Sequence, residues 1–274
     1  MELSLTEQLC YCTVRIECQN STGQISTGSG FFFNFKKSEK EIIPIVVTNK
    51  HVVNGMTIGR FIMTKADTNG NPTNTDHFTV TLPNLQSFIR QHPDSDVDLC
   101  ALPLAPILNH AQQNGIRLFY KSFDISLIPT AQQLDELTAL EDILMIGYPN
   151  GIWDSINNLP ILRRGSTATH PCIDYNGKKE FMIDAACFPG SSGSPILIFN
   201  PSGYTTKTGN IIMGSSRVLL VGVLYAGAQH TATGEIKVMT VPTFQQPVAF
   251  SRIPNNLGVV IKSERILELE KLFN

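Results

Sequence analysis

The chain has 274 residues, of which 42% are apolar and 16% charged, with a formal net charge of −2. This length fits one large all-β domain or two smaller lobes, and the apolar fraction is enough to build a core, which excludes a disordered chain. The 20 Gly and 16 Pro are close to average usage and exclude a collagen-like sequence. Because the charges include no long run of one sign, we expect no nucleic-acid partner.

The sequence contains no segment typical of a membrane or export signal. Its longest apolar stretch, residues 218–228, spans 11 residues and includes two glycines, whereas a membrane-spanning helix needs about 20. The N-terminus carries an acid at position 2 and no basic region before its apolar residues. We therefore expect a cytoplasmic protein without membrane attachment.

The six cysteines do not have the spacing of a metal or redox site. The nearest pair, Cys10 and Cys12, is one residue short of a CxxC motif, and the six histidines are widely separated. We expect free, mostly buried thiols, with no metal and no cofactor.

Strand-like segments rich in Val, Ile, Phe and Thr are separated by Gly, Asn, Asp and Pro, the residues of turns. A first group covers residues 12–18, 30–35, 41–49, 77–82 and 98–104. A second group covers residues 142–148, 180–185, 195–199, 218–226 and 236–241. The two groups predict an all-β fold of two packed antiparallel barrels.

Helical patterns are confined to three segments. Residues 105–115 and 130–140 each fit two or three turns, and residues 263–273 fit an amphipathic helix with Ser263 as its N-cap. The predicted organisation is one domain over residues 1–274, with an N-terminal barrel over about 8–115, a C-terminal barrel over about 140–262 and a closing helix over 263–274.

Three segments carry the residue types of a nucleophilic site, in the order His, Asp, Ser. His51 follows an apolar strand in VVTNKHVVNG, Asp98 opens an apolar run in DSDVDLCALPL, and Ser192 lies in the turn of DAACFPGSSGSPI. Each segment alone is typical of an ordinary strand end or turn. Their joint occurrence favours a site.

The serine turn is the most informative of the three. Gly190 and Gly193 can adopt positive φ and leave backbone amides exposed. If the N–H groups of Gly190 and Ser192 converge, they form a cradle for a developing oxyanion. A serine is a weak nucleophile alone, so it needs a base such as His51, itself oriented by a carboxylate.

Three aspartates compete for the role of orienting carboxylate. Asp94, Asp96 and Asp98 alternate, so their side chains share one face of an extended strand and parity cannot choose between them. The apolar run at 99–102 directly follows Asp98 and indicates entry into the core, whereas Asp94 and Asp96 lie among turn residues. We favour Asp98, and the register with Asp96 is the alternative.

These segments resemble the HtrA/Deg-type trypsin-like serine proteases. TNKHVV is similar to the family's TNxHVV segment, and DAACFPGSSGSP to its DAAxNPGNSGGP. GSGFFF at 28–33, GYPNG at 147–151 and NLGVVIKSERILELEKLF before the C-terminus also resemble family segments. The resemblance spans most of the chain and implies a chymotrypsin-like fold and serine endopeptidase activity on a protein or peptide substrate, with no cofactor.

The resemblance also assigns residues to roles. It implies a triad of His51, Asp98 and Ser192. The oxyanion hole is implied at Gly190, Ser191 and Ser192. The substrate pocket is implied to have Ala186 at its base and Tyr225, Ala226 and Gly227 along its wall. Since Ala186 carries no charge, a small or medium apolar residue is the expected preference at the cleavage position.

Two departures from the family pattern concern the serine turn. The second glycine after the nucleophile is Ser194 here, and the family's asparagine before it is Ser191. Trypsins of the secreted, zymogen type carry an aspartate in place of Ser191, and it holds the new N-terminus that cleavage creates. With Ser191 and no IVGG-like start, activation by that route is not expected. We also expect no PDZ module after residue 274.

Two alternatives to a constitutively active enzyme remain at the sequence level. One is a catalytically silent protease fold that serves as a peptide-binding or scaffold module. The other is an enzyme held inactive until a regulatory partner or homo-oligomer orders the 190–192 loop.

Overall fold

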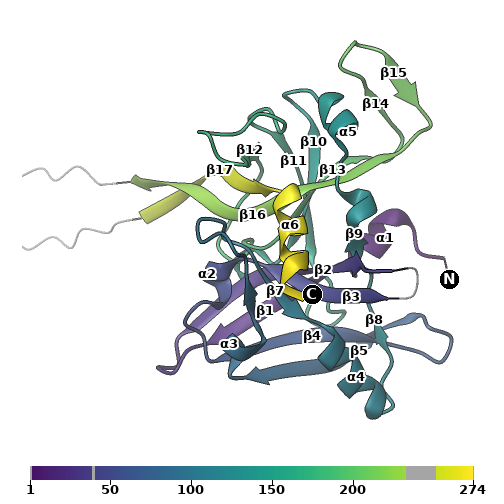
Figure 1. Cartoon of the computed structure of the whole chain (residues 1–274), viewed down its shortest axis with the longest axis vertical. Coiled ribbons are helices and arrows are strands. Elements are labelled where there is room, and N and C mark those ends of the chain that lie inside the picture. The colour runs from purple at the N-terminus through teal and green to yellow at the C-terminus, as the bar shows by residue number, and fades with distance from the viewer. Residues whose placement is uncertain (1, 39–40, 233–250, 274) are drawn as a thin grey trace, which may run out of the picture.

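The computed structural model describes residues 2–38, 41–232 and 251–273. Its strands form two large units, a nine-stranded sheet from the N-terminal half of the chain and a closed six-stranded barrel from the C-terminal half (Figure 1). The predicted all-β class, with two β units and a C-terminal helix, is confirmed.

The N-terminal sheet has the strand order β5-β4-β1-β2-β3-β7-β6, with β8 paired to β4 and β9 paired to β2. All of its neighbours are antiparallel except β2 and β9. The bounds are β1 Thr13–Gln19, β2 Ile25–Lys36, β3 Ile42–Thr48, β4 Ile58–Ala66, β5 Pro72–Pro83, β6 Arg90–Gln91, β7 Cys100–Pro103, β8 Leu118–Phe119 and β9 Phe123–Asp124.

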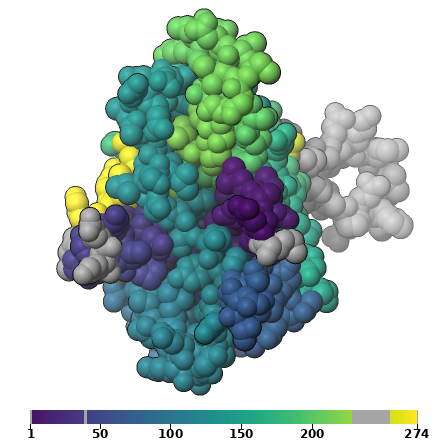
Figure 2. All heavy atoms as spheres, turned by 90° about the vertical axis from the view of Figure 1, so that its right-hand side faces the viewer, coloured from purple at the N-terminus to yellow at the C-terminus, as the bar shows by residue number. Residues whose placement is uncertain are grey.

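The C-terminal barrel closes in the order β10-β11-β12-β17-β16-β13. Its bounds are β10 Asp142–Gly147, β11 Ile161–Thr167, β12 Glu180–Asp184, β13 Pro195–Asn200, β16 Arg217–Ala232 and β17 Ser251–Lys262. A separate hairpin, β14 (Gly203–Thr205) and β15 (Ile211–Met213), extends from the barrel. In the perpendicular view of Figure 2, the green atoms of this region form one end of the molecule.

The helices are short and connect or close the two units. They are α1 Leu5–Leu9, α2 Lys50–Val53, α3 Leu85–Phe88, α4 Ala105–Gln113, α5 Ala131–Asp135 and α6 Glu264–Leu267, with 3₁₀ turns η1 Ile125–Leu127, η2 Pro149–Gly151 and η3 Glu268–Phe273. Ser263 occupies the N-cap of α6, but it has helical φ and ψ and its side chain makes no capping bond there. Instead its backbone N–H donates to the Val221 carbonyl.

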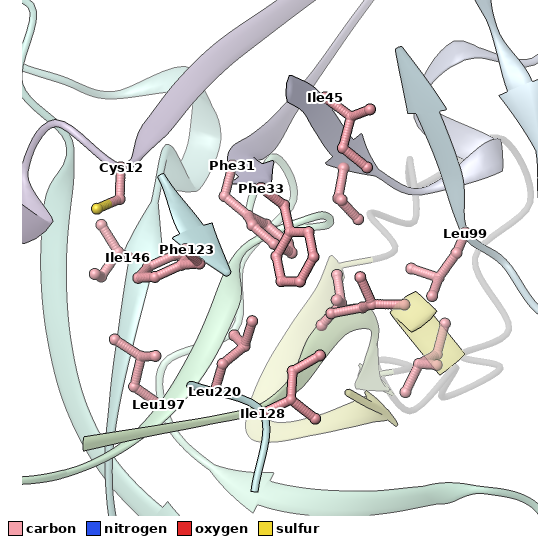
Figure 3. Close-up of a cluster of buried hydrophobic side chains, with 14 of the residues drawn as sticks. Cys12, Phe31, Phe33, Ile45, Leu99, Phe123, Ile128, Ile146, Leu197 and Leu220 are labelled. Carbon is pink, nitrogen blue, oxygen red and sulfur yellow. The ribbon is translucent and has the colours of Figure 1, made fainter. Parts of the chain in front are cut away.

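The largest buried cluster lies between the two units (Figure 3). Phe31 and Phe33 of β2 enter it from the N-terminal sheet, and Ile146 of β10 and Leu197 of β13 enter it from the barrel. Close packing of this kind leaves little freedom for one unit to shift against the other. The shared core therefore fixes β2 against the barrel strands next to the candidate site.

Most predicted strands are confirmed, with different ends. Among the strands outside the predicted segments are β4 and β11, whose sequences IGRFIMTKA and ILRRGST interrupt the apolar pattern with glycine and charge. The strand β17 and the short strands β6, β8, β9, β14 and β15 also lie outside those segments. The segment predicted helical at 130–140 contains only the single turn of α5. The predicted strand at 236–241 lies outside the described residues.

All six cysteines lie within the described ranges and are free thiols, as predicted, and four of them are buried. Burial raises the pKa of Cys12 and of Cys18 to about 12 and that of Cys187 to about 11, and it raises the pKa of Cys100 further still. Within the described residues, none of the helices has the length and hydropathy needed to cross a membrane.

We expect alkylation of the native protein at pH 8 to modify chiefly the two part-exposed thiols, Cys10 and Cys172. The buried thiols are shielded and almost fully protonated at that pH, and the thiolate is the reactive form. After unfolding without reductant, intact-mass measurement should count six labels. A count below six would indicate a disulfide and contradict this expectation.

Candidate functional site

His51 is held at the end of β3, where the strand becomes the short helix α2. Val52 and Val53 of that helix are buried, and they anchor the turn in the N-terminal core. The His51 side chain is 49% exposed. Burial of the two valines thus fixes the backbone at His51, while its imidazole stays accessible at the protein surface.

Asp98 lies two residues before β7 and contacts His51 twice. One carboxylate oxygen meets Nδ1 of the imidazole, and the other accepts the His51 backbone N–H at 3.0 Å. The amide group of Asn49 donates to the Asp98 backbone carbonyl at 2.7 Å. This arrangement favours a proton on Nδ1 and leaves Nε2 as the acceptor nitrogen.

The two other aspartates of this loop face elsewhere. Asp94 forms an ion pair with Arg265 of α6 at 2.6 Å. The Asp96 N–H donates to the Asp94 carboxylate, and this bond, together with Arg265, lowers the pKa of Asp94. Asp96 itself is exposed. Of the three candidates, the structure brings Asp98 to His51.

Ser192 lies in a turn whose shape requires two glycines. Gly190 has φ +86° and Gly193 has φ +88°, a conformation that other residues rarely adopt. A Cβ on Gly190 would lie 2.6 Å from the Tyr148 carbonyl oxygen, and one on Gly193 would lie 1.9 Å from the Ser29 carbonyl oxygen. Only glycine therefore fits at either position.

Two amides of this turn remain available to a ligand. Among the described residues, neither the Gly190 N–H nor the Ser192 N–H donates a hydrogen bond. The Pro189 carbonyl accepts from the Asn150 N–H at 2.5 Å. Since C=O and N–H point in opposite directions across a trans peptide, this bond directs the Gly190 N–H away from Asn150. The turn can therefore present two donors to an anion.

His51 and Ser192 line one cavity of about 280 Å³. The Ser192 hydroxyl donates to the Tyr225 carbonyl at 3.4 Å, and within the described residues it makes no hydrogen bond to His51. The remaining lining residues are Ser26, Thr27, Val52, Cys187, Phe188, Pro189, Gly190, Leu224, Ala226 and Gly227.

The cavity contains two of the four predicted pocket residues. Ala226 and Gly227 line it, whereas Ala186 and Tyr225 are not among its lining residues in the described part of the chain. The Ala186 carbonyl accepts from the Arg163 guanidinium at 2.5 Å. Burial raises the pKa of Tyr225 to about 12, and the charge of Glu180 adds to this rise.

Cys187 is one of several lining residues that sequence reasoning missed. Its side chain is buried beside Gly258 of β17, where a Cβ on that glycine would lie 2.5 Å from Sγ. The family resemblance implied Ala186, which lies one residue too early for the cavity. The irregular backbone between β12 and the serine turn hides which of two neighbouring side chains faces inward.

No group of three or more His, Cys, Asp or Glu in the described residues has the geometry to hold a metal ion. The functional groups at the site are the His51 imidazole, the Asp98 carboxylate, the Ser192 hydroxyl and two free backbone amides.

A family model described as trypsin-like peptidase domain matches residues 28–203. No protein of curated function matches the sequence.

Three similar solved structures are distant in sequence. The inactive form of the Ser343Ala mutant of Rv3671c from M. tuberculosis H37Rv is 14% identical, with 96% of this chain and 86% of that chain covered and a TM-score of 0.45. The HtrA-type protease AlgW with tripeptide is 15% identical, with 96% and 60% covered and a TM-score of 0.47. A structure titled GrC is 10% identical, with 99% and 97% covered and a TM-score of 0.49.

Proposed function

Since this chain belongs to the trypsin-like peptidase domain family, whose model matches residues 28–203, we propose that it is a serine endopeptidase. The contact between His51 and Asp98, with Ser192 in the same cavity, is the observation that supports this most strongly. Acyl transfer by a serine uses these groups: a base with a fixed tautomer, a hydroxyl that acts as nucleophile and free amides that bind the oxyanion.

In the proposed reaction, the Ser192 hydroxyl attacks the carbonyl carbon of the scissile peptide bond while His51 Nε2 takes its proton. Asp98 holds the imidazole in the correct tautomer and stabilises its charged form. The oxyanion is bound at the turn of Gly190, Ser191 and Ser192, through the amides of the first and third residues. His51 then returns the proton to the leaving amine, and water hydrolyses the acyl-enzyme by the same steps.

The present orientation of Ser192 is compatible with this mechanism. Its bond to the Tyr225 carbonyl is long at 3.4 Å, and such a bond is weak. Rotation about the Cα–Cβ bond carries the hydroxyl to a new direction without moving the turn. Catalytic hydrogen bonds often tighten only when substrate is bound.

A fluorophosphonate probe tests the proposal directly, because it phosphonylates only an activated serine. We expect labelling at Ser192, located by peptide mapping, and no labelling after heat unfolding. Peptide hydrolysis with no modification of Ser192 would contradict the assignment.

Cleavage specificity follows from the chemistry of the cavity walls. Within the described residues, no Asp, Glu, Lys or Arg side chain lines the cavity, and Leu224, Ala226 and Cys187 are apolar. A desolvated Lys or Arg would find no partner there, at a large cost. We expect a peptide library to show cuts after Val, Ala or Leu. Dominant cleavage after Arg or Lys would contradict this description of the pocket.

The orientation of Ser192 toward Tyr225 also supports a second candidate, a silent fold that binds peptides without cleaving them. Such a module would bind a library peptide with measurable affinity, fail to label with the probe and leave the peptide intact. The endopeptidase would label and cleave.

A further inference from the structure

We propose that Ser29 is a positioning residue that fixes the oxyanion turn and ties it to the half of the molecule that carries His51. This inference rests on the proposed function and assigns to Ser29 the alignment of the two free amides. Ser29 touches neither substrate nor the reacting atoms.

Two bonds connect Ser29 to the turn across the boundary between the two units. Ser29 lies in β2 and is fully buried. Its backbone N–H donates to the Ser192 carbonyl at 2.8 Å, and its hydroxyl donates to the Gly190 carbonyl at 2.9 Å. The carbonyls of the first and last residues of the oxyanion turn therefore both accept hydrogen bonds from one residue of the other unit.

The same hydroxyl also holds the segment on the far side of the turn. It accepts the backbone N–H of Tyr148 at 3.0 Å. Two residues later, the Asn150 N–H binds the Pro189 carbonyl at 2.5 Å. Ser29 thus connects the turn to the loop that orients the peptide bond preceding Gly190.

Ser29 also accepts a hydrogen bond from the segment that carries His51. The hydroxyl of Thr48, three residues before His51, donates to the Ser29 carbonyl at 2.7 Å. The close approach of Ser29 is possible because Gly193 and Gly147 have no Cβ, since added Cβ atoms would lie 1.9 Å from its carbonyl oxygen and 2.6 Å from its hydroxyl oxygen. The backbones of both units therefore meet at Ser29.

Removal of the hydroxyl would leave two buried backbone groups, the Gly190 carbonyl and the Tyr148 N–H, without a partner. A peptide plane with an unsatisfied carbonyl gains from rotating toward any donor. The peptide plane after Gly190 lies between the two planes that carry the free Gly190 and Ser192 N–H groups, and its own N–H, that of Ser191, donates to the Phe188 carbonyl at 3.0 Å. Its rotation would strain that bond and change the backbone angles on both sides, which would misalign the two free amides. Complete loss of one oxyanion donor typically costs about 10²–10³ in kcat, so partial misalignment should cost about 10- to 100-fold.

The experiment compares Ser29→Ala with a matched control, Thr167→Val. The Thr167 side chain is also a buried hydroxyl that donates to one carbonyl, at 2.7 Å to Ala139, and accepts one amide, at 2.8 Å from Glu141. It lies in β11 and does not line the cavity. Both variants should lose a similar amount of thermal stability, which separates stability from positioning.

We expect Ser29→Ala to lower kcat by about 10- to 100-fold with little change in KM, and Thr167→Val to keep both constants. A peptide aldehyde, which forms an oxyanion on binding, should bind Ser29→Ala more weakly by a similar factor, while the matching product peptide binds equally well. Equal kcat for wild type and Ser29→Ala would overturn the proposal.

A readout independent of activity keeps the positioning role separate from the proposed function. In Ser29→Ala, hydrogen exchange of a peptide covering residues 188–194 should be faster than in wild type, and in Thr167→Val it should be unchanged. If wild type neither cleaves nor labels, the endopeptidase proposal fails, and the exchange result still decides whether Ser29 holds the turn. Unchanged exchange in Ser29→Ala would overturn the inference.

Discussion

We expect Ser192→Ala to abolish nearly all peptide turnover while preserving the fold. Loss of a triad nucleophile typically lowers kcat by about 10⁶-fold, because base and carboxylate then have no group to activate. Only a part-buried hydroxyl is removed, and its one hydrogen bond within the described residues, to the Tyr225 carbonyl, is long at 3.4 Å. The thermal melting temperature should therefore stay close to that of wild type. Steady-state hydrolysis of an apolar peptide substrate and a melting curve provide the two measurements.

The control for this variant is Ser202→Ala, which removes an exposed serine hydroxyl after β13, outside the cavity. It should retain full activity and full probe labelling. Substantial hydrolysis by Ser192→Ala with normal melting would refute the assignment of the nucleophile, whatever the specificity of the protein.

Asp98→Asn has the second-largest expected effect, a loss of about 10⁴-fold in kcat. The carboxylate accepts both from the His51 backbone and from the Nδ1 side of the imidazole. An asparagine whose amide oxygen still accepts the His51 backbone N–H presents its NH₂ group to Nδ1 of the imidazole. Nδ1 must then accept that bond, which places the proton of the neutral imidazole on Nε2. His51 would then have no lone pair for the Ser192 proton. Substrate binding should change little, so the loss should appear in kcat.

Asp96→Asn and Asp94→Asn are the matched controls in the same loop, and both should keep activity within a few-fold of wild type. Asp94 pairs with Arg265, but its side chain is 45% exposed, and an ion pair at that exposure contributes little stability. A large loss in Asp96→Asn together with an active Asp98→Asn would mean that the loop adopts a register shifted by two residues in solution. The roles of His51 and Ser192 would stand in that case.

The sequence alone determined the local features of this protein. Apolar segments separated by turn residues predicted an all-β chain, and the structure confirms this prediction. The turn around Ser192 was predictable because only glycine tolerates the positive φ found at Gly190 and Gly193. The position of His51 at a strand end followed from the apolar run before it. In each case a few consecutive residues carry the whole signal.

The tertiary structure decided what depends on contacts between distant segments. Asp94, Asp96 and Asp98 are equivalent in strand parity, and only the packing of β7 beside β3 brings Asp98 to His51. Cys187 replaces Ala186 at the cavity because the backbone there is irregular, so side-chain direction has no fixed period.

Ser29 is the clearest case of a role that the sequence pattern alone does not reveal. Its hydroxyl meets Gly190 across 161 residues of sequence, and the strand pattern of β2 shows only a small residue between two glycines. A strand's period says which face a side chain occupies. The partner on that face is set by how two separately formed units pack together.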